Sequence, residues 1–351
     1  MRIKTIFLII FAFSLLIAAC TPKTSPVDAQ SLTIMTHDSF AISESLIAEF
    51  EAEHGVKVIF VRGGDAGTTL NQAILTKQNP VADVFFGLDN TFLTRALSEE
   101  LFMAYESPLL EQIPAAFKID PDNYALPVDY GDVCINYDKT YFSAHNLPVP
   151  TTLEALTEPQ YATLLVVENP ATSSPGLSFL MATIAHFGED GYLEYWSALK
   201  ENGVVVVSNW ETAYYTNFSG STGQGPQPMV VSYGSSPAAE VIFAETLLDE
   251  SPTGSIIGPD TCFRQIEFVG ILKNSSNPEL AKTFVDFMLS VPFQEDIPMQ
   301  MFVFPVNPHA DLPQAFLDHV DYPEQPASLP PELIDAQRET WINAWIEVVL
   351  D

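Results

Sequence analysis

Polar side chains follow several apolar runs of this sequence, at positions where a ligand site can form. Asp38, Asp65 and Asp89 each come just after a run that is typical of a β-strand. Ser173 and Ser236 lie in Ser-Ser-Pro segments that open predicted helices, where free N–H groups bind anions well. Each residue also has an ordinary structural role, since aspartates form turns and serines cap helices. Together these residues predict a polar rim around a ligand site.

Large aromatic residues fall in predicted loops close to the same rim. Trp210 and Tyr214-Tyr215 follow one predicted strand, Tyr233 ends another, and Phe302 lies in a connecting segment. Most of the 24 Phe belong to the core. A few aromatic rings on facing loops can instead hold a flat or cationic ligand, at about 0.5–2 kcal/mol for each contact. The nearby aspartates favour a cation.

The elements that position these residues form a repeating pattern. Three strand-loop-helix units are predicted in succession, with strands at 31–35, 56–61 and 82–87 and helices at 42–52, 68–77 and from about 91. Such units argue for a parallel α/β sheet whose ligand-facing loops lie at the carboxyl ends of the strands. The three aspartates and His37 fall in those loops or next to them.

The same pattern restarts in the second part of the chain, which predicts a two-lobed α/β protein. Each lobe is expected to be a mostly parallel sheet flanked by helices, with two crossing strands as the hinge. The first lobe comprises 31–130 and 263–310, and the second lobe comprises 131–262. Residues 311–351 are expected to form a helical segment that packs on the lobes.

Charge and motif content exclude several classes of function. The 351 residues contain 14 Lys and Arg against 45 Asp and Glu, a formal charge of −31, which disfavours nucleic-acid binding. The six histidines show no HExxH spacing and there is no GxSxG motif, so we expect neither an enzyme nor a cofactor. A secreted hydrolase using aspartate pairs is a remote alternative. A capture module explains a polar and aromatic cleft better.

The N-terminus carries an export signal. Arg2 and Lys4 precede an apolar run that ends at Ala19, which predicts a signal peptide over 1–19. Residues 17–20, Ile-Ala-Ala-Cys, resemble a lipobox, so we expect lipidation of Cys20, a flexible tether over 20–30 and anchoring to a membrane surface outside the cytoplasm. In that compartment Cys134 and Cys262 can form a disulfide or remain separate thiols, and their spacing does not decide between the two.

Several motifs, taken in order, resemble the thiamine-binding proteins of bacterial ABC importers. They cover nearly the whole mature chain and lie at 36–40, 84–90, 128–131, 172–177, 232–237, 297–306 and 336–345. The resemblance implies the two-lobed type II periplasmic-binding fold, which closes over one ligand and hands it to permease subunits. The ligand would be thiamine or one of its phosphates, and we expect the protein to be a monomer.

The resemblance also implies roles for individual residues. Asp65 would be an acidic ligand contact, Ser173 a polar contact at a helix start, and Trp210 and Tyr233 aromatic walls. His37 stands where the family has Tyr. Phe302 replaces a Trp that is common in the family, and Ala239 replaces a Tyr, so the aromatic cage is expected to be smaller.

A ferric-ion-binding protein of the same fold is the closest alternative. The adjacent Tyr214 and Tyr215 resemble the paired tyrosines of that family, and His37 lies near its histidine position. Phenolate and imidazole groups suit a hard metal. Adjacent tyrosines can also simply alternate between core and solvent, and the motifs at 38–40 and 88–90 follow the thiamine pattern.

Overall fold

The computed structural model describes residues 30–222, 224–246 and 248–351. The predicted signal peptide, the lipidated Cys20 and all of the tether except Gln30 lie outside the described residues.

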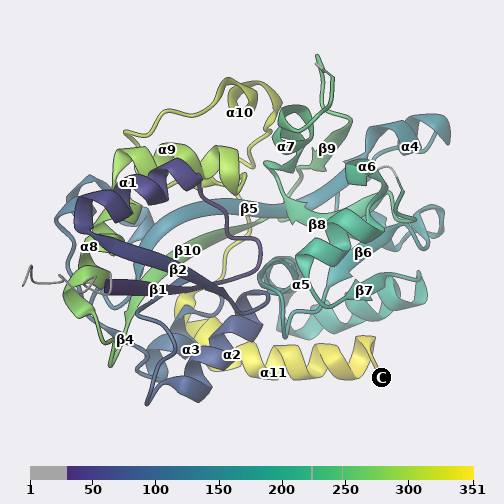
Figure 1. Cartoon of the computed structure of the whole chain (residues 1–351). Helices are drawn as coiled ribbons and strands as arrows, with labels where there is room; N and C mark the ends of the chain where they lie inside the picture. Colours follow the sequence, from purple (N-terminus) through teal and green to yellow (C-terminus); the bar gives the residue numbers. More distant parts are fainter. Residues whose placement is uncertain (1–29, 223, 247) are drawn as a thin grey trace, which may run out of the picture.

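One mixed β-sheet runs through both lobes (Figure 1). Its main path has the order β2-β1-β3-β10-β5-β8-β6-β7, with β4 paired to β10 and β9 and β11 paired to β5. The strands are β1 (Gln30–Thr36), β2 (Val56–Arg62), β3 (Val84–Asp89), β4 (Phe102–Met103), β5 (Leu126–Asp138), β6 (Leu165–Glu168), β7 (Val205–Val207), β8 (Met229–Tyr233), β9 (Thr253–Ile256), β10 (Phe263–Leu272) and β11 (Phe304–Pro305).

Two long strands at the centre of the sheet, β5 and β10, join the lobes. β1 pairs in parallel with β2 and β3, and β6 pairs in parallel with β7 and β8, as expected for strand-loop-helix units. β10 runs antiparallel to β3 and β5, and β5 runs antiparallel to β8. The predicted α/β class is therefore confirmed, with a sheet that is mixed where the lobes meet.

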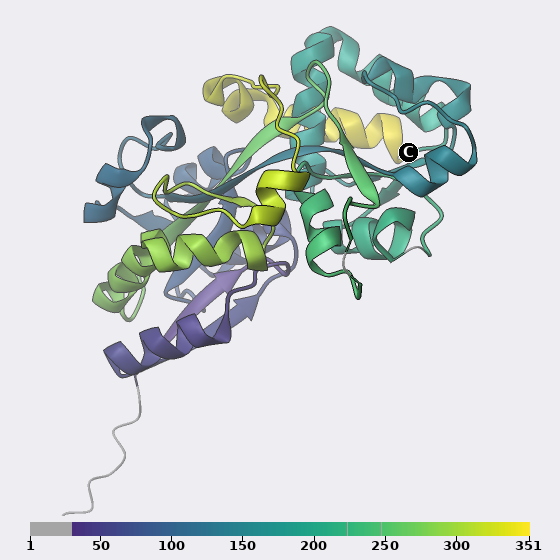
Figure 2. The ribbon, with the colours of Figure 1, turned by 90° about the horizontal axis from the view of Figure 1, so that it is seen from above.

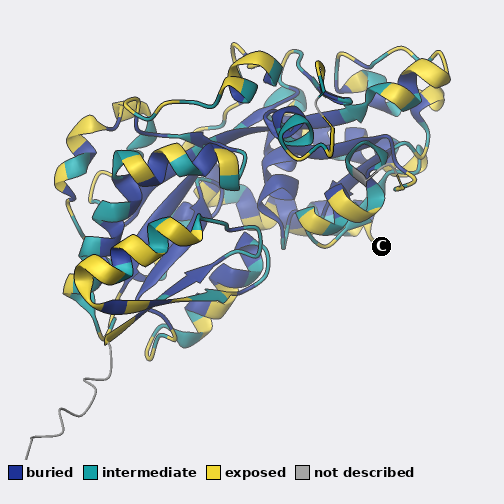
Figure 3. Ribbon diagram, turned by 45° about the horizontal axis from the view of Figure 1, so that its top comes forward, coloured by how far each residue is buried: buried dark blue, intermediate teal, exposed yellow. Residues whose placement is uncertain are grey.

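Helices cover the sheet and bury its central strands, while the edge strands β2 and β7 stay partly exposed (Figures 2 and 3). They are α1 (Glu44–His54), α2 (Ala66–Thr76), α3 (Leu93–Ser98), α4 (Lys139–Ala144), α5 (Ser174–Glu201), α6 (Ser219–Thr222), α7 (Ser236–Ile242), α8 (Pro278–Leu289), α9 (Val291–Gln300), α10 (Gln314–His319) and α11 (Pro331–Val349). Short 3-10 turns lie at Pro108–Gln112, Ala115–Phe117, Glu154–Thr157 and Pro159–Tyr161, and a π-helical turn lies at Thr212–Asn217.

The C-terminal helix contacts both lobes. On one side the ring of Trp345 packs edge-on against Trp196 of α5, with 5.3 Å between ring centroids. On the other side the Arg338 guanidinium lies over the ring of Phe92, which precedes α3. α11 therefore braces the two lobes on the side of the molecule where it runs beneath the sheet in Figure 1.

The lobe junction also carries a disulfide. Cys134 in β5 is bonded to Cys262, the residue before β10, and the two are 128 positions apart in sequence. Both side chains are buried. This crosslink ties together the two strands that connect the lobes.

Among the residues that the structure describes, no helix combines the length and apolar character needed to cross a bilayer.

Candidate functional site

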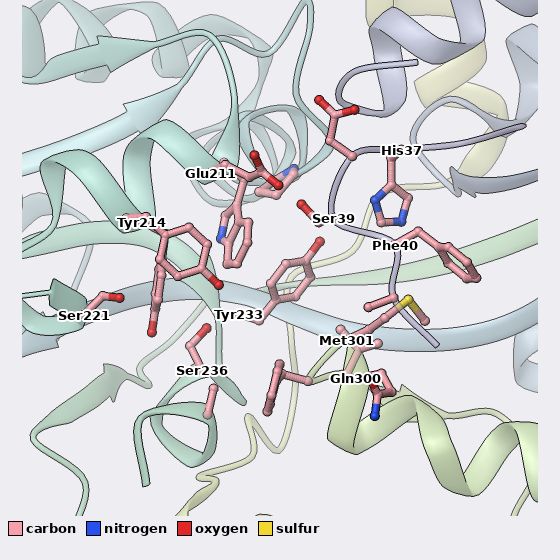
Figure 4. A pocket seen from close by; sticks show the side chains of 18 of the residues that line it. His37, Ser39, Phe40, Glu211, Tyr214, Ser221, Tyr233, Ser236, Gln300 and Met301 are labelled. Atoms are coloured by element: carbon pink, nitrogen blue, oxygen red, sulfur yellow. The ribbon is translucent and has the colours of Figure 1, made fainter. Parts of the chain in front are cut away.

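A cleft of about 750 Å³ opens between the two lobes. Its first-lobe wall comes from the segment after β1, the start of α2 and the segment after α9, and its second-lobe wall comes from the starts of α5 and α7 and from the segment after β7. Figure 4 shows His37 and Phe40 on one side, Tyr214 and Ser236 on the other, and the ring of Tyr233 between them.

Four aromatic side chains form the second-lobe wall. The rings of Trp210 and Tyr214 are stacked, with centroids 5.1 Å apart and an interplanar angle of 20°. Tyr215 and Tyr233 stand roughly edge-on to Trp210, at 5.5 and 6.4 Å. The Trp210 indole Nε1 donates to Ser232 Oγ at 2.9 Å, which fixes the orientation of the indole ring. This wall presents π faces and edges to the cleft.

Asp65 provides a carboxylate at the meeting point of the lobes. It is the N-cap of α2, and its Oδ1 accepts from the N–H of Ala66 at 2.7 Å. It also accepts from second-lobe main-chain N–H groups, with Oδ1 3.3 Å from Ser174 N and Oδ2 3.4 Å from Trp210 N. Burial raises the pKa of Asp65 above its usual value, and the neighbouring Ser173 hydroxyl and the N–H groups of Ala66 and Ser174 oppose that shift.

His37 and Asp38 lie in the cleft wall that follows β1. Burial disfavours the imidazolium form of His37, but the negative charges of Glu267, Asp65 and Asp38 together outweigh burial and raise the pKa of His37. His37 Nε2 and Glu267 Oε2 are 3.7 Å apart. Asp38 Oδ1 accepts from the N–H of Gly64 at 3.0 Å, so this aspartate also orders the turn before α2.

Ser236 and Phe302 line the cleft from opposite lobes. The hydroxyls of Ser236 and Ser232 are 3.0 Å apart, and Ser232 is also the acceptor for Trp210. Phe302 has a positive φ of 58° and packs against Phe243 with 4.9 Å between ring centroids. The Phe302 carbonyl accepts from the Ser235 hydroxyl, which makes a further hydrogen bond between the lobes.

Two of the sequence-predicted residues do not line this cleft. Asp89 was expected at the rim, but it is the last residue of β3, its side chain is fully buried, and its Oδ1 accepts from the N–H and hydroxyl of Thr91. The strand begins and ends two residues later than the apolar run 82–87 predicts, and this shift carries Asp89 into the sheet. Ser173 is also fully buried, and its neighbour Ser174 faces the cleft instead.

The cleft contains acidic residues that the sequence analysis did not single out. Glu211, Glu240 and Glu267 line it, whereas Arg62 is the one arginine of its lining. Glu267 could have been noticed, because it is a charged residue inside the largely apolar run 263–272. In the described part of the chain, no group of three His, Cys, Asp or Glu side chains is arranged to hold a metal ion.

Comparison with known proteins agrees with this architecture. Residues 79–327 match the family model described as bacterial extracellular solute-binding protein. The chain is 30% identical to a thiamine-binding periplasmic protein of Brucella suis, over 90% of this chain and 91% of that one. It is also 30% identical to a thiamine-binding periplasmic protein of Escherichia coli K12, over 93% and 96% of the two chains.

A solved structure of a periplasmic thiamin binding protein superposes with a TM-score of 0.80 at 28% identity, covering 92% of this chain and 96% of that one. The two-lobed periplasmic-binding fold predicted from the sequence is thus confirmed. With a family model that spans most of the chain, and relatives that align along nearly all of it, this protein belongs to the bacterial extracellular solute-binding proteins.

Proposed function

We propose that this protein captures thiamine between its two lobes and delivers it to the permease subunits of an ABC importer. One juxtaposition carries the proposal: the Asp65 carboxylate and the rings of Trp210, Tyr214 and Tyr233 border the same cleft. A thiazolium ring is a flat, permanent cation, and aromatic faces with a nearby carboxylate attract such a group. The named relatives, which are thiamine-binding proteins, support the same ligand.

Closure of the lobes over the ligand is the proposed mechanism. Asp65 contacts main-chain N–H groups of the other lobe, and Ser235 contacts the Phe302 carbonyl across the cleft. These few contacts can break and re-form while each lobe stays rigid, with β5 and β10 bending as the hinge. A bound ligand that touches both walls would favour the closed form, which the permease would then select. The lobe boundaries at 130/131 and 262/263 remain part of this proposal.

The paired tyrosines fit an aromatic wall better than an iron site. The Tyr214 hydroxyl donates to Glu240 Oε1 at 2.7 Å, and its ring stacks on Trp210. The ring of Tyr215 stands perpendicular to that of Tyr214, and its side chain is half exposed. Ferric-ion binding through these two phenols is therefore the weaker alternative, and a hydrolase weaker still, because the family is one of solute-binding transport proteins.

Calorimetric titration tests the ligand assignment. The purified protein, freed of bound ligand by unfolding and refolding, is titrated with thiamine, thiamine monophosphate, thiamine diphosphate and Fe(III). We expect saturable 1:1 binding of at least one thiamine form and none of iron. Absence of binding to every thiamine form, together with tight iron binding and a tyrosinate charge-transfer colour, would overturn the proposal.

Membrane attachment through Cys20 completes the proposed function. The protein works outside the cytoplasm, as its family does, and we propose that a lipid on Cys20 holds it, as a monomer, close to the permease. Metabolic labelling with a fatty-acid probe, followed by membrane fractionation, tests the anchor. Wild-type protein should carry the label and sediment with membranes, and Cys20→Ala should do neither.

Light scattering after delipidation measures the molar mass in solution and so tests the proposed monomer.

A further inference from the structure

Glu267 is an acid of the cleft floor that lies where the lobes join. It belongs to β10, between β3 and β5, and its residue is 7% exposed while still lining the cleft. In register it lies directly opposite Asp89 of β3 and Asp129 of β5. Three acidic residues therefore lie side by side on three adjacent strands. Of this row, Glu267 is the residue that lines the cleft.

The Glu267 carboxylate has acceptor capacity to spare. Its Oε1 accepts from Gln265 Nε2 at 3.2 Å, and its Oε2 lies 3.7 Å from His37 Nε2, beyond hydrogen-bonding distance. An ionised carboxylate offers about four lone-pair positions. The neutral form of Asp129 supplies one more donor, and the positions that face the cleft have no donor among the described residues. A donor from a bound ligand would satisfy them.

Burial disfavours negative charge on the two flanking acids of the row. Burial raises the pKa of Asp89 to about 7, although Thr91 donates two hydrogen bonds to it. Burial, and then the charge of Glu267, raises the pKa of Asp129 well above its usual range. Both neighbours are fully buried and neither lines the cleft, so the low dielectric around them favours their neutral forms.

Asp65, in contrast, is already occupied. Its two oxygens accept from three main-chain N–H groups, those of Ala66, Ser174 and Trp210. It can attract a cation at long range, but it has fewer positions left for hydrogen-bond donors of a ligand. Donors on the ligand are therefore better matched by Glu267 than by Asp65.

We propose that Glu267 is a specificity-determining residue whose carboxylate accepts hydrogen bonds from the amino group of the ligand's aminopyrimidine ring. The inference rests on the proposed function, because thiamine joins a cationic thiazolium to such a ring. A carboxylate only accepts, so an analogue that presents a carbonyl oxygen in place of the amino group meets repulsion there. Glu267 thus recognises the aminopyrimidine end of the ligand, while the aromatic wall and Asp65 attract the cationic thiazolium end.

The test compares two ligands on three proteins. Thiamine and oxythiamine, in which an oxo group replaces the amino group, are titrated into wild type, Glu267→Gln and the control Glu332→Gln. Glu332 is an exposed acid of α11 away from the cleft, so its variant changes charge alone. We expect wild type and control to prefer thiamine by about tenfold or more, and Glu267→Gln to lose that preference and bind thiamine about tenfold more weakly.

Three outcomes overturn the inference, and they are distinguishable. Equal binding of thiamine and oxythiamine by wild type overturns the inference. This comparison needs no variant, so the inference stays testable even if Glu267→Gln does not fold. An unchanged thiamine-to-oxythiamine ratio in folded Glu267→Gln also overturns it, while the proposed thiamine function stands. If wild type binds no form of thiamine, the proposed function fails, and this inference fails with it.

Discussion

The Asp65 carboxylate accepts a hydrogen bond from the main-chain N–H of Ser174, the first residue of α5, at 3.3 Å across the cleft. The same oxygen caps α2 through the N–H of Ala66. One carboxylate therefore serves the N-terminal ends of two helices that belong to different lobes. Since helix N-termini favour negative charge, Asp65 holds the lobes together at the place where a cationic ligand would enter.

Asp65→Asn should weaken thiamine binding by about tenfold or more, because it removes the negative charge and keeps the shape of the side chain. The amide oxygen can still accept from Ala66 N, so α2 should retain its cap. Calorimetry gives the affinity, and circular dichroism checks that the fold is intact. Wild-type affinity in this variant would remove Asp65 from the binding site.

Trp210 allows the aromatic contribution to be separated from that of its hydrogen bond. Trp210→Ala removes the ring that stacks on Tyr214, and should weaken thiamine binding by about tenfold or more. Trp210→Phe removes the Nε1 donor to Ser232 but keeps an aromatic ring, although a smaller one, so its loss should be smaller than that of Trp210→Ala. Tryptophan fluorescence titration of wild type and calorimetry of both variants measure this order. Equal losses would show that the hydrogen bond, rather than the ring, matters.

Apolar runs predicted most of the elements of this fold. The run at 31–35 became β1, and the amphipathic pattern at 278–289 became α8 with the same bounds. Other elements lack such a signal. β9, with the sequence Thr-Gly-Ser-Ile, is short and polar and forms because β5 lies beside it. The helix α9 contains Pro298, a residue that normally argues against a helix.

A residue of the candidate site could be predicted where it directly follows a predicted strand of its own strand-loop-helix unit. Elsewhere the local sequence indicates much less. Asp65 and Tyr233 could be placed at the rim from their local context, and both line the cleft. Glu267 stands out in sequence as a charge inside an apolar run, but its place in the cleft could not be predicted, because its setting depends on Asp89 and Asp129 from strands far away in sequence. Register across a sheet brings such residues together, and no local pattern records it.

The disulfide should contribute substantially to stability. It closes a long loop, since Cys134 and Cys262 are 128 positions apart, and crosslinks of this kind restrict the unfolded chain. The double variant Cys134→Ala/Cys262→Ala should lose about 2–5 kcal/mol of unfolding free energy, measured by urea denaturation. Wild type with dithiothreitol during unfolding should match the variant, whose own curve should not respond to the reductant. Identical curves for oxidised wild type and the variant would contradict this expectation.

Asp89 should make stability fall as the pH rises towards neutrality. Its pKa is about 7 in the folded protein, against about 4 for an unfolded aspartate, so between these values the folded state binds one proton more. Linkage then makes the unfolding free energy fall by up to about 1.4 kcal/mol per pH unit between these two pKa values. The stabilisation from this group is completely lost only above the folded pKa. Asp89→Asn keeps an oxygen for Thr91 and cannot titrate, so its unfolding free energy should depend less steeply on pH between 5 and 7. Parallel curves for the two proteins in urea denaturation would show that Asp89 is already ionised in the folded state.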